Sequence, residues 1–362
     1  MFADVYQGRR VLVTGHSGFK GSWLVAWLER LGARVLGYSL GPLAEPSHWS
    51  LLGLESPSVW GDIGDAPRLD DAVERFQPQI IFHLAAQPLV RASYDDPVAT
   101  YQTNVIGTLR VLEAARRAGS ARAVVVVTTD KCYENREQER GYTEEDAMGG
   151  YDPYSSSKGC AELATSSYRR SFFHPDAYGN SHRTLIASVR AGNVIGGGDW
   201  AVDRLLPDAV RAVGAGRAVE IRKPEATRPW QHVLDPLSGY LLLGQRLLAG
   251  DTACATGWNL GPQDAPMTVR EVLERFCESL PDLRASYGTE KPDRHEANLL
   301  QLDCSKAQRE LGWRPVWDGR AAIDATARWY ADFLNDGTLR TADDLSHYLD
   351  DAATARVGWA GA

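Results

Sequence analysis

The first half of the chain alternates short apolar runs with amphipathic segments. Apolar runs predict strands at residues 10–15, 34–40, 79–86, 121–129 and 183–196. Helical spacing of apolar positions predicts helices at residues 21–33, 67–78, 99–119 and 155–173. The four consecutive valines at 124–127 lack polar alternation, which is typical of a strand buried on both faces. This order predicts a parallel sheet covered by helices on both faces.

The second half is less regular. Amphipathic segments at residues 203–216, 236–250, 268–280 and 320–336 predict further helices. We therefore predict one domain over residues 1–195, to which the chain returns around 228–260, and a smaller mixed α/β substrate domain over 196–345. Residues 346–362 are rich in alanine and glycine and are expected to form a frayed tail.

Composition and charge exclude several classes of partner. The formal net charge is −8 and no long basic run occurs, which argues against nucleic acid or an anionic membrane as the main partner. The five cysteines are odd in number and form no CxxC pair, so neither a disulfide framework nor a metal site is expected. The N-terminus enters a strand without an apolar stretch suited to a signal peptide or membrane span, so a cytoplasmic location is expected.

A glycine loop follows the first predicted strand. Gly15, Gly18 and Gly21 form GxxGxxG between a strand and a helix, which favours a dinucleotide pyrophosphate at the helix N-terminus. Asp62 follows a short candidate strand and is a second candidate contact, with a helix N-cap as the alternative. An acidic residue about 20 positions beyond the glycines, common in NAD-binding folds, is missing, so this loop leaves NAD or NADP open. This glycine loop, together with the alternation of strands and helices, predicts a Rossmann-type doubly wound sheet.

Two further pairs of residues are candidates for a catalytic role. Tyr154 and Lys158 are four residues apart and share a helical face. An ammonium group one turn away is expected to lower the pKa of the phenol, which would let it exchange a proton with an alcohol. Asp130 and Lys131 end the valine strand, where α/β proteins bind ligands; a surface ion pair is the alternative. Trp23, Trp27 and His83 are interpreted as core residues.

Together, TGxxGxxG, LAA and YxxxK make the chain similar to the extended short-chain dehydrogenase/reductase family over roughly residues 8–335. The longer stretches "GHSGFKGSWL", "TTDKCYEN" and "ATRPWQHVLDPLSGYLLL" resemble nucleotide-sugar dehydratases, in particular their CDP-glucose branch. The wider group has a glutamate where Lys131 stands, and the CDP-glucose branch shares the lysine.

This resemblance implies an NAD-dependent enzyme acting on a nucleotide sugar, with CDP-glucose as the expected substrate. The implied catalytic residues are Thr129, Asp130, Lys131, Tyr154 and Lys158. The implied cofactor-binding residues are Gly15, Gly18, Phe19, Lys20, Gly21, Asp62, Ile63, Leu84, Ala85, Ala86, Gln87, Asn104, Thr128, Tyr154 and Lys158. The implied substrate-binding residues are Asn193, Arg204, Arg228 and Arg294. The helices that contain Asn104 and Lys158 are expected to pair with a second subunit in a homodimer.

The implied reaction is an internal redox cycle: oxidation of the sugar at C4, loss of water across C5 and C6, and return of the hydride to C6. Asp130 is expected to act as the acid for the 6-hydroxyl and Lys131 as the base at C5, provided that burial and the nearby Lys158 lower the pKa of this lysine. If Lys131 stays charged, it is expected to stabilise the enolate instead. A nucleotide-sugar 4-epimerase and a non-catalytic NAD-sensing module are the alternative functions.

Overall fold

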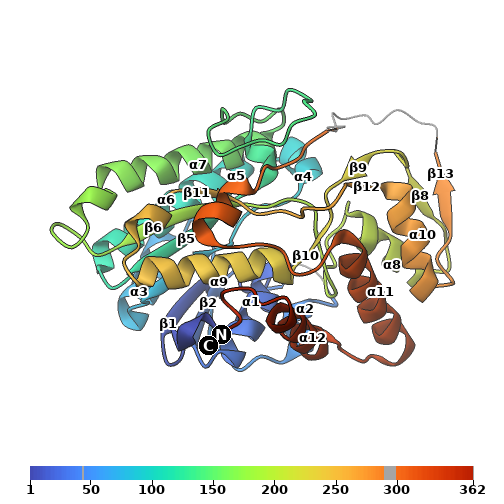
Figure 1. Ribbon diagram of the computed structural model, residues 1–362, viewed down its shortest axis with the longest axis horizontal. Coiled ribbons are helices and arrows are strands. Elements are labelled where there is room, and N and C mark those ends of the chain that lie inside the picture. The colour runs from blue at the N-terminus through green and yellow to red at the C-terminus, as the bar shows by residue number, and fades with distance from the viewer. Residues whose placement is uncertain (43–44, 289–298, 362) are drawn as a thin grey trace.

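A seven-stranded, entirely parallel sheet forms the centre of the computed structural model, which describes residues 1–42, 45–288 and 299–361 (Figure 1). Its spatial order is β11-β6-β5-β4-β1-β2-β3. The order reverses between β1 and β4, and this is the point at which doubly wound sheets bind ligands. The strands are β1 (Arg10–Thr14), β2 (Arg34–Ser39), β3 (Ser58–Trp60), β4 (Ile80–His83), β5 (Ala123–Val127), β6 (Leu185–Arg190) and β11 (Gly257–Asn259).

Helices cover both faces of this sheet. One face packs on α1 (Phe19–Arg30) and α9 (Leu234–Leu248), and the other on α3 (Ala66–Phe76), α6 (Gly107–Ala118) and α7 (Pro153–Ser171). Val125 of β5 contributes to the first core, whereas Val124 and Val126 contribute to the second. This two-sided burial explains the uninterrupted valine run and confirms the predicted fold class.

The helix predicted over residues 99–119 consists of three consecutive pieces. They are α5 (Pro97–Tyr101), a π-helical turn (Gln102–Ile106) and α6, and the separate helix α4 (Val90–Asp95) precedes them. Asn104 lies in the π-helical turn and is buried. π-Turns inside helices are frequent at functional sites.

A smaller layer of helices and short strand pairs lies beside the carboxyl edge of the sheet (Figure 1). Its helices are α8 (Leu205–Gly214), α10 (Val269–Ser279) and α11 (Gly319–Asp336). The chain leaves this layer to form α9 and the edge strand β11 of the main sheet. The strand pairs are β7 (Val194–Ile195) with β10 (Gln231–His232), β8 (Val219–Ile221) with β13 (Ala285–Tyr287), and β9 (Thr227–Arg228) with β12 (Met267–Thr268). The short helix α2 (His48–Leu52) connects β2 and β3.

The prediction of a frayed C-terminal tail is wrong. Helix α12 (Thr341–Thr354) extends into the expected tail, and Trp359 beyond it is buried. The Trp359 ring stacks on Phe2 with the ring centroids 5.1 Å apart, and the Phe2 amide donates to the Trp359 carbonyl at 2.8 Å. Burial of one large aromatic ring outweighs the flexibility of the surrounding alanine and glycine residues.

Trp23 and Trp27 of α1 are buried in the core, as predicted. His83 is also a packed side chain, because its two ring nitrogens lie 2.7 Å from the Thr14 hydroxyl and 3.0 Å from the Thr108 hydroxyl. Within the described ranges, the helices are all too short or too polar to cross a bilayer.

Candidate active site

The glycine loop connects β1 to α1 at the switch point of the sheet. Gly15 has a φ of +73°, and a Cβ atom there would lie 2.6 Å from the backbone nitrogen of Ala85. At Gly21, a Cβ atom would collide with the carbonyl oxygen of Gly15. Gly18 is the N-cap of α1 and has no side chain to occupy the amides of the first turn, so these amides can receive a pyrophosphate. The loop therefore fits a dinucleotide cofactor.

The loop after β4 lies against the glycine loop and is tied to the catalytic helix. The Leu84 amide donates to the Thr14 carbonyl at 3.0 Å. Asn104 accepts from the Gln87 amide at 2.8 Å and donates to the Ser157 hydroxyl of α7, also at 2.8 Å. The structure thus brings the predicted 84–87 segment, the π-turn and α7 together.

Asp62 lies immediately after β3 and is exposed. Its carboxylate accepts from the Gly64 amide at 2.6 Å, while Asp65 caps α3 by accepting from the Arg68 amide. The alternative interpretation of Asp62 as the N-cap of this helix is therefore wrong. Ile63 is buried and packs where Gly107 leaves space.

Thr129, Asp130 and Tyr154 meet beyond the carboxyl end of β5. The Thr129 hydroxyl donates to the Asp130 carboxylate at 2.8 Å, and the Tyr154 phenol lies close enough for this hydroxyl to lower its pKa. All three side chains are buried. Gly192 packs against the Asp130 carboxylate, where a Cβ atom would collide with it. A phenol and a carboxyl group therefore face one small region, as the proposed chemistry requires.

The expectation that Lys158 lowers the pKa of Tyr154 is wrong. Burial raises the pKa of Tyr154 to about 12, against the lowering effects of the Thr129 hydrogen bond and the Arg204 charge. The Lys158 ammonium group donates to the Val127 carbonyl at 3.3 Å. Burial lowers the pKa of Lys158 to about 8, although the Glu162 charge opposes this. The desolvation of both groups is larger than the charge effect inferred from their spacing.

Lys131 also departs from its expected environment. Its side chain is exposed, although it lines the same cavity as Asp130. Burial is one of the two factors expected to lower its pKa, and this side chain is not buried; its role as the base at C5 stays a prediction. Whether a side chain at a strand end is buried depends on loops that are distant in sequence. A local motif therefore does not predict it.

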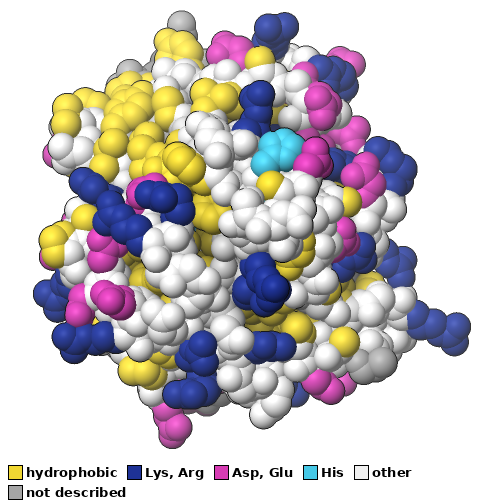
Figure 2. Space-filling model, turned by 90° about the vertical axis from the view of Figure 1, so that its left-hand side faces the viewer, with side chains coloured by type: hydrophobic (Ala, Val, Ile, Leu, Met, Phe, Trp, Pro, Cys, Tyr) yellow, Lys and Arg dark blue, Asp and Glu magenta, His cyan; other side chains and the backbone are white. Residues whose placement is uncertain are grey.

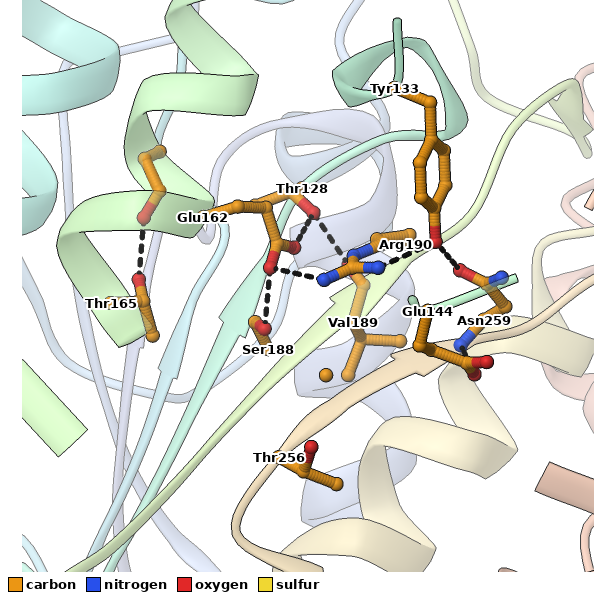
Figure 3. A network of polar contacts seen from close by, with 12 residues as sticks. Thr128, Tyr133, Glu144, Glu162, Thr165, Ser188, Val189, Arg190, Thr256 and Asn259 are labelled. Carbon is orange, nitrogen blue, oxygen red and sulfur yellow. Dashed lines mark hydrogen bonds and ion pairs between the residues drawn. The ribbon is translucent and has the colours of Figure 1, made fainter. Parts of the chain in front are cut away.

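A buried polar network supports the catalytic helix from behind (Figure 3). Glu162 of α7 pairs with Arg190 at 2.9 Å and accepts from the hydroxyls of Thr128 and Ser188 at 2.5 and 2.7 Å. Burial would raise the pKa of Glu162, but the Arg190 charge and these hydrogen bonds hold it below its ordinary value. Thr128, predicted to contact the cofactor, directs its hydroxyl into this network.

The cavity beside this cluster has a volume of about 460 Å³, which is within the range of small-molecule sites. Asp199 belongs to it and was missed by sequence analysis; it is buried and accepts from Arg204 at 2.7 Å. No local signal marks Asp199, because its partner and the cavity come from tertiary folding. Arg294 lies outside the described residues. The predicted residues that line the cavity are Lys20, Thr129, Asp130, Lys131, Tyr154, Asn193, Arg204 and Arg228.

A doubly wound sheet, a glycine loop at its switch point and a tyrosine–lysine pair on α7 define an enzyme of the extended short-chain dehydrogenase/reductase class. Within this class, the chain belongs to the GDP-mannose 4,6 dehydratase family, whose model matches residues 12–326.

Similar proteins include both dehydratases and epimerases. The chain is 47% identical to a CDP-glucose 4,6-dehydratase of Salmonella typhimurium, over 98% of this chain and 99% of the relative. A solved structure of the epimerase Mth375 of Methanothermobacter thermautotrophicus has a TM-score of 0.81 at 25% identity and covers 92% of this chain and 95% of its own. DesIV, a dTDP-glucose 4,6-dehydratase of Streptomyces venezuelae solved with NAD and TYD bound, has a TM-score of 0.73 at 26% identity over 89% and 97%.

Proposed function

We propose that the chain catalyses the NAD-dependent conversion of CDP-glucose to CDP-4-keto-6-deoxyglucose and water. The observation that carries this proposal is the convergence of Thr129, Asp130 and Tyr154 on one cavity. The high identity to a relative named CDP-glucose 4,6-dehydratase, over nearly the whole of both chains, supports the choice of substrate.

In this reaction, Tyr154 takes the proton of the sugar 4-hydroxyl, and the Thr129 hydroxyl binds the oxygen at C4. A bound NAD would supply the hydride chemistry, which is removal of hydride from C4 and its return to C6. Asp130 protonates the departing 6-hydroxyl, so that water leaves. The ketone that the oxidation forms at C4 acidifies the C5 proton before water leaves, and a base on the protein must remove this proton. Lys131 lines the same cavity, as both of its expected roles require.

NAD fits the residues at the switch point of the sheet. The glycine loop and the first turn of α1 would hold its pyrophosphate, and the 84–87 segment would lie beneath it. The buried ammonium of Lys158, on the same helix as Tyr154, donates to the Val127 carbonyl at 3.3 Å. We assign residues 1–195, together with the returning segment around 228–260, to the cofactor domain and the rest of 196–345 to the nucleotide-sugar domain.

Cationic side chains of the second layer suit a nucleotide diphosphate. Arg204, Arg222, Lys223 and Arg228 all line the cavity, and their charges complement two phosphate groups. Asn193 lies on the same wall and has a φ of +50°, a conformation that asparagine tolerates better than most residues. We infer that these residues orient the sugar toward Tyr154.

We further infer a homodimer and a cytoplasmic location. Val98, Ile106 and Leu163, on α5, the π-turn and α7, are exposed apolar residues on elements that pack together. Such a surface suits a second copy of the same helices. The five cysteines are all free, which suits a reducing compartment.

The test is incubation with NAD and CDP-, dTDP-, GDP- and UDP-hexoses, followed by mass spectrometry. Loss of one water from CDP-glucose is the expected result. An isomer of unchanged mass would instead identify a 4-epimerase, and binding without turnover would identify an NAD-sensing module. Tyr154→Phe and Asp130→Asn should lose turnover by about 10²–10⁴-fold while binding NAD as the unmodified protein does.

A further inference from the structure

Helix α7 turns a row of charged side chains toward the protein interior. Lys158, Glu162 and Arg169 are spaced four and seven residues apart, so they share one face of the helix, and all three are buried. Arg190 of β6 faces Glu162 from the sheet. Because a buried charge is costly unless it is paired, the Glu162 carboxylate is placed to balance three buried cations.

The Glu162 carboxylate has hydrogen-bond donors on both of its oxygens (Figure 3). Thr128 donates to one oxygen at 2.5 Å, and Ser188 donates to the other at 2.7 Å. Arg190 donates to this second oxygen at 2.9 Å. Hydrogen bonds to a carboxylate favour its ionised form. Glu162 therefore keeps a negative charge at a fixed place, one helical turn beyond Lys158.

The other titratable groups around Lys158 supply no negative charge. They face it from β4, from α1 and from the turn after β5, and they are His83, Lys20 and Cys132. Burial lowers the pKa of His83 to about 3 and raises the pKa of Cys132 well above its ordinary value, so both are neutral near neutral pH. Lys20 can add only positive charge. Among these groups, Glu162 is the one that favours the ammonium form of Lys158.

Resting on the proposed function, we propose that Glu162, paired with Arg190, is a positioning residue that keeps Lys158 in its ammonium form. Lys158 is among the residues expected to bind the cofactor, and an ammonium group has three N–H donors. One of them is directed to the Val127 carbonyl at 3.3 Å, which leaves the others for hydroxyl groups of a ligand. Loss of the proton would remove a donor and the positive charge. Glu162 thus acts through Lys158.

The pKa values of these groups agree with the geometry. Burial lowers the pKa of Lys158 to about 8, and the charge of Glu162 opposes this. Burial would raise the pKa of Glu162, but the charge of Arg190 and the hydrogen bonds hold it below its ordinary value. Without the charge of Glu162, the pKa of Lys158 would fall further, so a large fraction of this side chain would be the neutral amine at neutral pH.

The direct test is an NMR titration of Lys158 in the full chain, without cofactor or substrate. A carbon-13 label at the lysine Cε reports loss of the ammonium proton, and Lys158→Met identifies the signal. The unmodified protein should titrate with a midpoint at about pH 8. Glu162→Gln should lower this midpoint by about 1–3 pH units. Glu162→Asp, which keeps the charge, should restore most of the difference.

A second variant keeps the test decisive if Glu162→Gln fails to fold, because that change leaves Arg190 buried without a counter-charge. The double variant Glu162→Gln/Arg190→Met removes both charges, and neutral replacement of a buried pair is often tolerated. Its Lys158 midpoint should also fall by about 1–3 pH units. An unchanged midpoint in a folded variant would overturn the proposal. A midpoint below neutral pH in the unmodified protein would do the same, since Glu162 would then fail to maintain the ammonium.

Affinity for NAD gives a second readout that does not depend on turnover. Calorimetric titration with NAD at about pH 6 and about pH 7.5 compares the folded variants with the unmodified protein. The variants should bind NAD about 10-fold or more weakly at the higher pH, and the loss should be smaller at the lower pH, where more of Lys158 regains its proton. An equal loss at both pH values would mean that Glu162 only supports the fold. Failure of the proposed function is distinguishable, because neither titration uses a sugar; the unmodified protein would then release no dehydrated sugar from any nucleotide hexose.

Discussion

At the scale of single residues, the buried pair Glu162–Arg190 is the most consequential interaction outside the cavity. Both side chains are almost fully enclosed, and Glu162 lies one helical turn beyond Lys158 (Figure 3). Arg190 also donates to the Tyr133 hydroxyl, which in turn donates to Asn259. The network therefore joins α7, β6 and the loop after β5, which carry the catalytic groups.

We expect Glu162→Gln to destabilise the protein by about 3–5 kcal/mol, because Arg190 would remain buried without its counter-charge. Glu113→Gln is the matched control, since Glu113 pairs with Arg116 on the surface of α6. The control should lose no more than about 1 kcal/mol. Urea unfolding monitored by circular dichroism measures both variants, and equal losses would contradict the importance of the buried pair.

At the scale of elements, α5, the π-turn and α7 present apolar side chains to solvent. Val98, Ile106 and Leu163 are 66%, 43% and 59% exposed. The side of the molecule shown in Figure 2 has a continuous group of hydrophobic side chains at its upper left. Hydrophobic side chains exposed side by side mark an interaction surface more often than isolated ones do.

Leu163→Glu is therefore expected to shift the protein from dimer to monomer, because it would place a charge in an apolar interface. Leu334→Glu is the matched control, since Leu334 is a partly exposed leucine on α11, in the other layer. Light scattering after size-exclusion chromatography gives the mass of each species. A Leu163→Glu variant that remains dimeric while folded would place the interface elsewhere.

Elements also show what sequence patterns can predict. Periodicity predicted four strands of the parallel sheet within a few residues, because burial on both faces leaves an uninterrupted apolar run such as 124–127. The single strand predicted over 183–196 is divided into β6 and β7, and only β6 joins this sheet. It did not predict the π-turn at Asn104, because apolar periodicity is judged over a window of about 11–18 residues, which is longer than a single turn. The exposure of Lys131 was also unpredictable, because distant segments after β6 and α8 build its surroundings.

At the scale of the whole molecule, the two ends of the chain lie side by side (Figure 1). Trp359 stacks on Phe2 and Tyr348, and its ring also meets Trp27 of α1 edge-on. The last residues thus pack onto the hydrophobic core on the face of the sheet that α1 covers.

Replacing Trp359 by alanine should cost about 3–5 kcal/mol, because a large buried aromatic side chain would leave a cavity. Trp60→Ala is the control, since Trp60 is 41% exposed and should contribute less. Thermal unfolding of the two variants provides the comparison. Equal transition temperatures in Trp359→Ala and the unmodified protein would mean that the C-terminal residues do not belong to the cooperative core.

Buried carboxyl groups make the stability of the whole molecule depend on pH. Asp235 of α9 is fully buried and accepts from the Val316 amide at 2.7 Å and the Tyr348 hydroxyl at 2.8 Å. Burial raises its pKa to about 7, and burial likewise raises the pKa of Asp344 to about 7. Unfolded aspartate titrates near 3.9, so folding favours the protonated form of both groups.

The stabilisation linked to these protons is complete below about pH 4 and is lost as pH rises through about 7. We therefore expect the contribution of these two groups to the free energy of unfolding to fall between about pH 5 and about pH 8. Asp235→Asn keeps an oxygen acceptor for Val316 and Tyr348 but cannot ionise, so its unfolding free energy should fall less, and it should exceed that of the unmodified protein at the higher pH. Asp71→Asn, at an exposed pair with Arg75, is the control and should retain the unmodified slope. Urea unfolding at about pH 5 and about pH 8 measures the fall in unfolding free energy of each protein. An equal fall in Asp235→Asn and the unmodified protein would mean that Asp235 does not carry a buried proton at neutral pH.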